Sequence, residues 1–403
     1  MGRLMQGPLF FAVLFGLVTA ASAAPPALIE VESNRKKYEG KVILNLEEQF
    51  WLMQTDGRIH ELRVSQTQRF RQIAPKFSPA SPSHLAGALT KELGKGFQVA
   101  TSRNYVVAAA SGEKARQYAN VLEDSYRAFR QYFSVRGLKL SDPEVPMIAI
   151  VFPTQGQFTT YAQQDRVASG QGLAGYYSPM SNRVALFESE QKMALRSPLE
   201  TLPGAPRWNQ PDPLLTRFEA GFAEESRGDS PFAFANFGKV SGDLKDTLVH
   251  EAIHQAAFNT GLHPRLGPTP RWVVEGLATV FEAPGIRNSS AIGEKARINP
   301  ERQIWFGNYA QSRRKEKSLE AFLTSDKLFE TNTLDGYAEA WALSFYLIEK
   351  RPRDYAKFLA RMSARSPLAA FTAKERLEDF RETISKDILL IESEMLRHQK
   401  SLK

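Results

Sequence analysis

The stretch T-L-V-H-E-A-I-H, residues 247–254, is the part of the chain around which the predicted fold is organised. It contains the pattern H-E-x-x-H, in which two histidines stand four residues apart with a glutamate after the first. Positions i and i+4 lie on the same face of a helix, so His250 and His254 can direct both imidazoles at one point. Glu251 is rotated by about 100° from His250 and stands beside that point. The spacing therefore predicts a metal-binding helix with an acid–base residue next to the metal.

A second predicted helix carries the run W-V-V-E-G-L-A at residues 272–278. Glycines and prolines within residues 261–268 end the first helix and reverse the chain before the second begins. This separation of His254 from Glu275 allows the glutamate to return to the two imidazoles. We expect the metal ligands to be His250, His254 and Glu275.

The predicted ligand set is typical of one metal. Two imidazoles and one carboxylate form the set found in catalytic zinc sites, which keep a fourth position open. We therefore expect Zn²⁺ as the cofactor and Glu251 as the base. The competing interpretation is coincidence or a degenerate site, because H-E-x-x-H also arises by chance. The correctly spaced E-G-L-A run and the presence of the base favour a catalytic site.

These runs resemble those of a known group of enzymes. Residues 250–254 and 272–278 are similar to the gluzincin zinc peptidases, in which two histidines of one helix and a glutamate of the next bind the metal. The E-G-L-A form resembles the peptidase-MA-like branch of secreted bacterial proteins of unknown function. The resemblance implies a zincin-like domain and a peptide or protein substrate. Two features differ: Thr279 stands where thermolysin-like enzymes have an aspartate that orients a ligand histidine, and no G-x-M-E-N exopeptidase signature is present.

The N-terminal segment, residues 1–23, has the features of a secretory signal peptide. Arg3 gives it a basic start, residues 9–18 are an apolar run, and A-S-A at residues 21–23 fits a cleavage site. No later stretch has the roughly 20 uninterrupted apolar residues that a membrane-spanning helix needs. We predict a secreted or periplasmic protein without an integral membrane segment after signal removal.

The charge and the lack of cysteine exclude several classes of site. The chain has 52 Lys and Arg against 44 Asp and Glu, a net charge of +8, and no cysteine. Disulfides, thiolate zinc ligands and a cysteine nucleophile are therefore excluded. Basic residues cluster only at residues 35–37 and 313–315, without interleaved aromatics, so we expect no nucleic-acid partner. We interpret the charge as a solvated surface, with attraction to anionic cell-wall polymers, lipid heads or acidic substrates as the alternative.

The order of predicted elements indicates an α+β fold. Residues 24–78 show short strands and turns, which we interpret as a small β-barrel-like module. Residues 79–403 are predicted to form the zincin-like metallopeptidase domain, with a helix over 112–135 and a buried strand over 147–152 before the metal helix. Prolines and glycines make residues 189–242 an irregular insertion. Helical periods after the second metal helix predict a C-terminal helical lobe.

The strand predicted at residues 182–187 leads to a hypothesis about substrate binding. In the resembled peptidases, the last strand before the metal helix is a sheet edge on which an extended peptide lies. An edge strand offers unpaired N–H and C=O groups to such a peptide. The alternative is an inner strand paired on both sides, and the sequence does not separate the two.

Two further residues are candidates for stabilising the oxyanion. Tyr337 begins the run Y-A-E-A-W-A-L, at the place where the resembled family often has a tyrosine facing the zinc. Its hydroxyl is a suitable hydrogen-bond donor to an oxyanion, although a core tyrosine at the junction of the lobes fits equally well. His263, between the two metal helices, is the weaker candidate.

These features together predict a secreted zinc-dependent peptidase in which metal-activated water attacks a peptide bond and Glu251 acts as the base. Two alternatives remain. One is a non-catalytic secreted binding protein that retains a zinc site, and the other is a zinc amidase acting on cell-wall material. The sequence does not indicate the substrate, endo- or exopeptidase action, or the oligomeric state.

Overall fold

The computed structural model divides the chain into two compact units. The first comprises the described residues up to Gln54 together with Glu61–Ser78, and the second comprises Thr55–His60 and the chain from Pro79 onward. The predicted signal peptide and most of the predicted insertion lie outside the described residues. The structure describes residues 26–167, 173–188, 234–237, 244–287 and 294–402.

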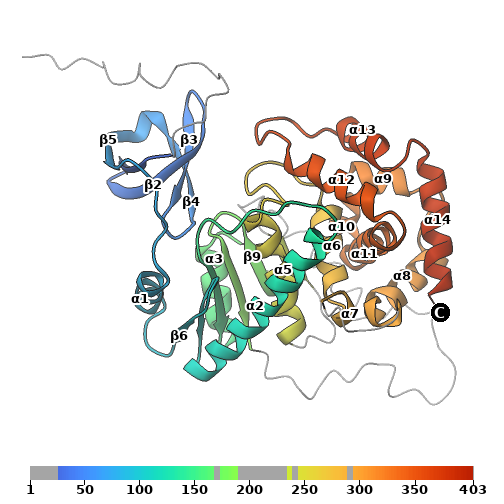
Figure 1. Cartoon of the computed structure of the whole chain (residues 1–403), viewed down its shortest axis with the longest axis horizontal. Coiled ribbons are helices and arrows are strands. Elements are labelled where there is room, and N and C mark those ends of the chain that lie inside the picture. Colours follow the sequence, from blue (N-terminus) through green and yellow to red (C-terminus); the bar gives the residue numbers. More distant parts are fainter. Residues whose placement is uncertain (1–25, 168–172, 189–233, 238–243, 288–293, 403) are drawn as a thin grey trace, which may run out of the picture. The chain divides into compact units, whose positions relative to one another are not determined.

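The N-terminal unit is a five-stranded sheet in the order β4-β3-β2-β1-β5 (Figure 1). Buried and partly buried side chains alternate along β1, so Ile29 and Val31 face the same small core as Phe50 and Leu52 of β3. No strand pairing in the described residues joins β4 to β5, so the sheet is open where a barrel would be closed. The strands are β1 (Leu28–Ser33), β2 (Lys36–Asn45), β3 (Gln49–Gln54), β4 (Ile59–Arg63) and β5 (Thr67–Ala74).

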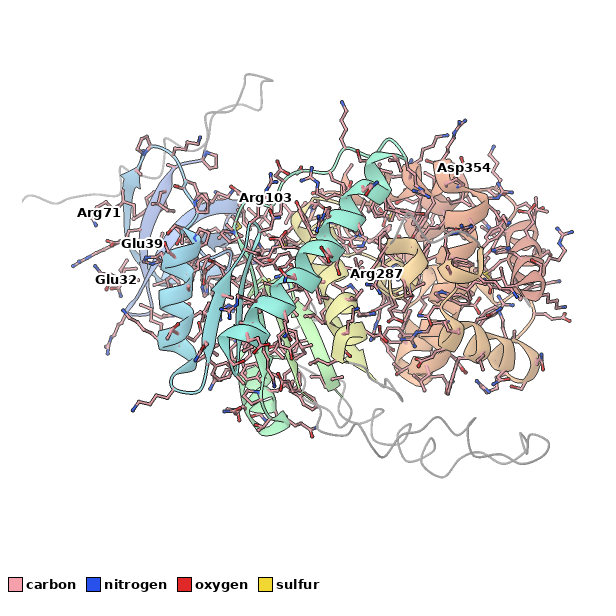
Figure 2. The ribbon with its side chains drawn as sticks, turned by 60° about the horizontal axis from the view of Figure 1, so that its bottom comes forward. Glu32, Glu39, Arg71, Arg103, Arg287 and Asp354 are labelled. Carbon is pink, nitrogen blue, oxygen red and sulfur yellow. The ribbon has the colours of Figure 1, made fainter. Side chains whose placement is uncertain are left out.

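Charged side chains project from this sheet, and Figure 2 labels Glu32, Glu39 and Arg71 among them. Arg71 lies 3.2 Å from Glu30 across the β1–β5 pair, and Arg69 lies 3.7 Å from Glu32. Such solvent-exposed pairs contribute little to stability. They do show that the basic residues of β5 face acidic residues of β1 and do not form a patch of one sign.

The second unit contains a six-stranded mixed sheet in the order β11-β9-β10-β8-β7-β6. Strands β7, β8 and β10 are parallel and buried on both faces, which explains why their sequences are apolar apart from Arg183 at the start of β10. Strands β6, β9 and β11 pair antiparallel with their neighbours. The strands are β6 (Gln98–Thr101), β7 (Tyr105–Ala109), β8 (Met147–Phe152), β9 (Leu173–Ser178), β10 (Arg183–Phe187) and β11 (Phe234–Phe237).

The strand predicted at residues 182–187 is an inner strand, so the hypothesis that it forms the sheet edge is wrong. Strand β10 pairs with β8 on one side and β9 on the other, and Ala185 is in register with Ile150 and Tyr176. The edge beyond β9 is occupied by β11, a strand within the segment predicted to be irregular. The backbone groups of β10 are therefore used within the sheet, and an extended peptide cannot pair with them.

Helices cover both faces of this sheet (Figure 1). Helices α2 and α5 pack on the face that carries Tyr105 and Val107, and α1 and α3 pack on the face that carries Val106 and Ala108. Serine or threonine side chains cap α1, α2 and α3 by accepting a hydrogen bond from the backbone N–H three residues further on. The bounds are α1 (Pro82–Leu93), α2 (Gly112–Ser134), α3 (Gln155–Gln164) and α5 (Leu244–Asn259).

From residue 244 onward, the regular elements of the described residues are helices, so the predicted α+β architecture with a C-terminal helical region is confirmed. None of the helices in the described part of the chain is long and apolar enough to cross a membrane. The remaining helices are α6 (Arg271–Phe281), α7 (Pro284–Arg287), α8 (Pro300–Ser312), α9 (Leu319–Thr324), α10 (Lys327–Thr331), α11 (Thr333–Lys350), α12 (Pro352–Ser363), α13 (Ala373–Thr383) and α14 (Ile388–Ser401).

The glycine of the E-G-L-A run allows α6 and α11 to pack closely. A Cβ atom on Gly276 would lie 2.2 Å from the Oγ of Ser344 and 2.6 Å from the backbone oxygen of Ala340. Both distances are far below van der Waals contact, so any larger residue forces the two helices apart. This close approach brings Tyr337 of α11 alongside the helix that carries Glu275.

Candidate metal centre

Helix α5 places the two histidines of H-E-x-x-H one turn apart and inside the protein. His250 is 0 % and His254 is 1 % exposed, and their Nε2 atoms lie 3.0 Å apart. The buried residues of α5 include an unbroken run from Thr247 to Phe258, because the helix lies between the sheet and α6. The surrounding core therefore fixes the orientation of both imidazoles.

Helix α6 brings the predicted third ligand to the same point. The Oε2 atom of Glu275 lies 3.3 Å from the Nε2 of His250 and 3.3 Å from the Nε2 of His254. These distances fit a tetrahedral metal site, since ligand bonds of roughly 2.0–2.1 Å place neighbouring ligand atoms about 3.3 Å apart. The three residues form a buried group with the ligand atoms and spacing to hold a metal ion.

The charges of this group also suit a metal cation. Burial opposes a charge on His250, but hydrogen bonds with Glu275 and Glu282 outweigh it and raise the pKa of His250 to about 9. Burial lowers the pKa of His254 below its ordinary value. Burial alone would raise the pKa of Glu275, yet the two imidazoles hold it well below its usual range. A metal cation can replace the proton that His250 carries between two carboxylates.

A further carboxylate, missed in the sequence, orients the first histidine. Oε1 of Glu282 lies 2.8 Å from Nδ1 of His250, and Oε2 accepts a hydrogen bond of 2.5 Å from the Asn299 side chain. Arg302 adds a cation 3.6 Å from the same carboxylate. Metal-binding histidines commonly donate their second N–H to such a carboxylate, which fixes the tautomer and the ring.

Thr279, which stands where thermolysin-like enzymes have the orienting aspartate, has another role. Thr279 donates its hydroxyl hydrogen bond to backbone oxygens of its own helix, at Glu275 and Gly276. Glu282 follows Glu275 by seven residues, or about two helical turns, so it returns to the same side of the chain as the ligand. That spacing is the sequence signal that identifies it.

The two predicted catalytic residues are close to the ligand triangle. Glu251 is 0 % exposed and follows His250 directly on α5, and its negative charge acts on the proton equilibria of both His250 and Tyr337. The ring of Tyr337 lies 6.3 Å from the His250 ring. Burial raises the pKa of Tyr337 well above its usual value, Glu275 adds to the rise, and Arg271 opposes it. The tyrosine is therefore a neutral hydroxyl beside the carboxylate ligand.

The weaker oxyanion candidate, His263, is buried. Its ring packs against Phe258 at 5.3 Å, and neither ring nitrogen has a hydrogen-bond partner among the described residues. Burial lowers its pKa to about 3, and the charge of His254 contributes to the shift. His263 is not part of the ligand group, and nothing in its contacts favours a role in oxyanion binding.

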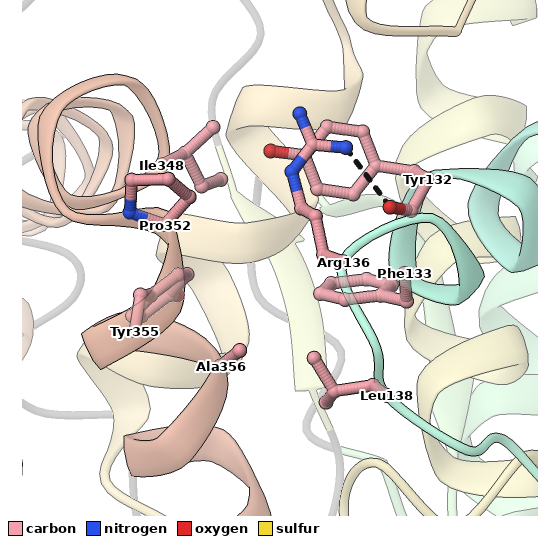
Figure 3. A pocket seen from close by; sticks show the side chains of 8 residues that line it. All are labelled: Tyr132, Phe133, Arg136, Leu138, Ile348, Pro352, Tyr355 and Ala356. Atoms are coloured by element: carbon pink, nitrogen blue, oxygen red, sulfur yellow. Dashed lines mark hydrogen bonds between the residues drawn. The ribbon is translucent and has the colours of Figure 1, made fainter.

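A small cavity in the helical region lies apart from this group. It has a volume of about 10 Å³, is bounded by Tyr132 and Phe133 of α2 and by Pro352 and Tyr355 of α12, and includes Arg136, which stacks on Tyr132 (Figure 3). A space of that size holds about one water molecule. The cavity is a packing defect between helices and is too small for a substrate.

Residues 245–369 match a family described as "Protein of unknown function (DUF1570)". The match contains all three ligand residues, Glu251 and Tyr337. No curated protein matches the chain. The comparison therefore links the metal-site segment to a family for which no activity is described.

Proposed function

We propose that the chain is a secreted or periplasmic zinc-dependent peptidase. The observation that carries the proposal is the buried triangle of two imidazole nitrogens and one carboxylate oxygen, with ligand atoms 3.0–3.3 Å apart and Glu251 next to it. A structural zinc site uses four protein ligands, whereas this group supplies three, as catalytic sites do. Two imidazoles and one carboxylate suit zinc by their chemistry.

The chain's own residues divide the work of hydrolysis. His250, His254 and Glu275 would hold the ion, and Glu282 would keep the His250 ring in place. The chemistry that a bound zinc ion supplies is Lewis acidity, which lowers the pKa of water and polarises a carbonyl. Glu251 takes a proton from the attacking water and later gives it to the nitrogen of the leaving amine.

Tyr337 completes the proposed machinery. Its hydroxyl lies in the field of Arg271 and Glu275 and stays protonated at neutral pH, so it can donate a hydrogen bond to the oxygen on which negative charge develops. Residues 182–187 have no part in this proposal, because β10 is an inner strand of the sheet.

Cleavage profiling tests the proposal. The zinc-loaded mature chain is incubated with a peptide library derived from a proteome, with and without a chelator, and new termini are identified by mass spectrometry. We expect cleavage that the chelator removes and that Glu251→Gln abolishes while its zinc content stays at the wild-type value. If the zinc-loaded chain cleaves no peptide, or if Glu251→Gln cleaves as the wild type does, the proposal fails.

A further inference from the structure

Arg271 places a positive charge between the metal centre and solvent. It stands one helical turn before Glu275 on α6, and its Nε lies 3.9 Å from the Oε1 of that ligand. Its side chain is 26 % exposed, whereas Glu275 is 0 % and the second nearby cation, Arg302, is 9 % exposed. Arg271 is therefore the charged side chain of this group that both reaches the ligand carboxylate and meets water.

The surroundings hold this guanidinium in place. It lies over the ring of Phe329, with 4.9 Å from Cζ to the ring centroid, and it hydrogen-bonds with Tyr337. Its backbone N–H donates to Asp326, and both carboxylate oxygens of Asp326 are also bound by Arg376. A cation held in this way binds an anion without a large loss of side-chain freedom.

The guanidinium also keeps hydrogen-bonding capacity. Arginine has five N–H donors in a planar fork that suits a carboxylate. Among the described residues, the only carboxylate within 4 Å of the guanidinium is Glu275, at 3.9 Å, which is longer than a hydrogen bond. The contact with Tyr337 occupies one part of the fork, so other donors remain for a ligand.

The charges around the centre also favour binding of an anion. A zinc ion with Arg271 and Arg302 brings four positive charges, and the facing carboxylates of Glu251, Glu275 and Glu282 bring three negative charges. One positive charge remains, and the partly exposed Arg271 is where an anion from solvent can meet it.

We propose that Arg271 binds a carboxylate of the substrate close to the scissile bond and makes the centre selective for peptides that carry a negative charge there. The carboxylate is either the C-terminus of the peptide or an Asp or Glu side chain. The inference rests on the proposed peptidase function, since it names the substrate class of the same centre. The alternative role of Arg271 is structural, through Phe329 and Tyr337 alone.

Equilibrium binding tests this without hydrolysis. The zinc-loaded full chain carrying Glu251→Gln is titrated with two pairs of probes, and Kd is obtained by ligand-observed NMR. One pair is acetyl-Ala-Phe-Ala with a free or an amidated C-terminus, and the other is acetyl-Ala-Asp-Ala-amide or acetyl-Ala-Asn-Ala-amide. We expect the carboxylate member of at least one pair to bind about 10- to 100-fold more tightly than its amide twin, as charge-assisted hydrogen bonds produce. The pair that responds identifies the source of the carboxylate.

Three variants in the same background locate the effect. The quantity compared is the Kd of the amide probe divided by the Kd of its carboxylate twin. Arg271→Gln is expected to bring this ratio to within about twofold of one. Arg271→Lys keeps the charge but loses the planar fork of donors, so it is expected to lower the ratio by about threefold or more. Arg353→Gln, at an exposed residue of α12, removes one charge elsewhere and should keep the ratio. Zinc content and thermal stability are measured for each variant, because a purely structural Arg271 would change these and leave the ratio intact.

The outcomes separate this inference from the proposed function. A ratio near one for both probe pairs overturns the inference, even if the wild-type chain hydrolyses peptides. A ratio that Arg271→Lys leaves unchanged also overturns it, even if Arg271→Gln does not fold. A ratio that Arg271→Gln removes supports the carboxylate site, even if no hydrolysis is found with the wild type.

Discussion

The carboxylate of Glu282 lies 2.8 Å from Nδ1 of His250 and is itself held by Asn299 and Arg302. This contact comes from the end of α6, the helix that also supplies Glu275, so one helix provides both a candidate ligand and the support of another candidate ligand. Both ring nitrogens of His250 therefore face a carboxylate, Nε2 that of Glu275 and Nδ1 that of Glu282.

Removing the charge of Glu282 is expected to weaken metal binding. In Glu282→Gln, the ring of His250 loses its anionic partner, and zinc affinity should fall by about 10- to 100-fold. Competition with a chromogenic chelator measures the affinity. Thr279→Val is the matched control, because the Thr279 hydroxyl bonds only to backbone oxygens of its own helix in the described contacts, and its affinity should match the wild type. Equal affinities for both variants would exclude the orienting role.

The hydroxyl of Tyr337 is expected to act on turnover. Tyr337→Phe keeps the ring in the core and removes one oxyanion donor, so kcat should fall by about 100-fold or more with KM and zinc content unchanged. Steady-state kinetics on a peptide found by the cleavage profile measure this. Tyr346→Phe, on the same helix, removes a hydroxyl that bonds to Glu394 and should leave kcat unaltered. A wild-type kcat in Tyr337→Phe would assign the tyrosine to packing alone.

The contact between α6 and α11 predicts an effect on stability. Gly276→Ala drives a methyl group into Ser344 and Ala340, so the free energy of unfolding should drop by about 1–3 kcal/mol or more. Gly307 in α8 has no atom within 4 Å of an added Cβ, so Gly307→Ala should raise stability by about 0.5–1 kcal/mol. Urea unfolding followed by circular dichroism compares the two. If Gly276→Ala has the same free energy of unfolding as the wild type, the close approach of the two helices is contradicted.

His263 predicts a dependence of stability on pH. Burial lowers its pKa from 6.5 to about 3. Below pH 6.5 this histidine therefore binds a proton in the unfolded chain but stays neutral in the folded chain, so folding stability falls as the pH falls. The metal-free wild type should therefore lose about 1–3 kcal/mol more stability than His263→Phe between pH 7 and pH 4.5. Unfolding in urea at the two pH values measures the difference. Parallel losses in both proteins would mean that His263 is not buried as a neutral ring.

Much of the ligand group was predictable because it depends on local geometry. The four-residue spacing of His250 and His254 fixes their common face, and the helix breakers before residue 270 allow Glu275 to return. The orienting residue was not predicted, because the carboxylate that contacts His250 stands seven residues after Glu275, at Glu282, and not four residues after it, at Thr279. Arg302 and Asn299 could not be found at all, since their contacts depend on how α8 packs.

The strand order could not be predicted from the sequence either, because it also depends on tertiary structure. Alternation and apolar content describe the burial of β10 but not its neighbours, and pairing with β8 and β9 is decided by the topology of the whole sheet. Within the predicted C-terminal helical lobe, α13 and α14 are separate helices because Asp387 caps a new start. Helix α1 was missed because its short pattern buries only Leu85 and Leu89.

The measurement closest to the central claim is the zinc content of the purified chain after reconstitution and exhaustive dialysis. Inductively coupled plasma mass spectrometry should find about one zinc ion per wild-type chain and per chain of the control His84→Ala, which alters an exposed histidine of α1. His250→Ala, His254→Ala and Glu275→Ala should each retain less than about a tenth of that amount, because each removes one of three ligands. A wild-type chain without zinc, or a Glu275→Ala chain that keeps it, would contradict the account.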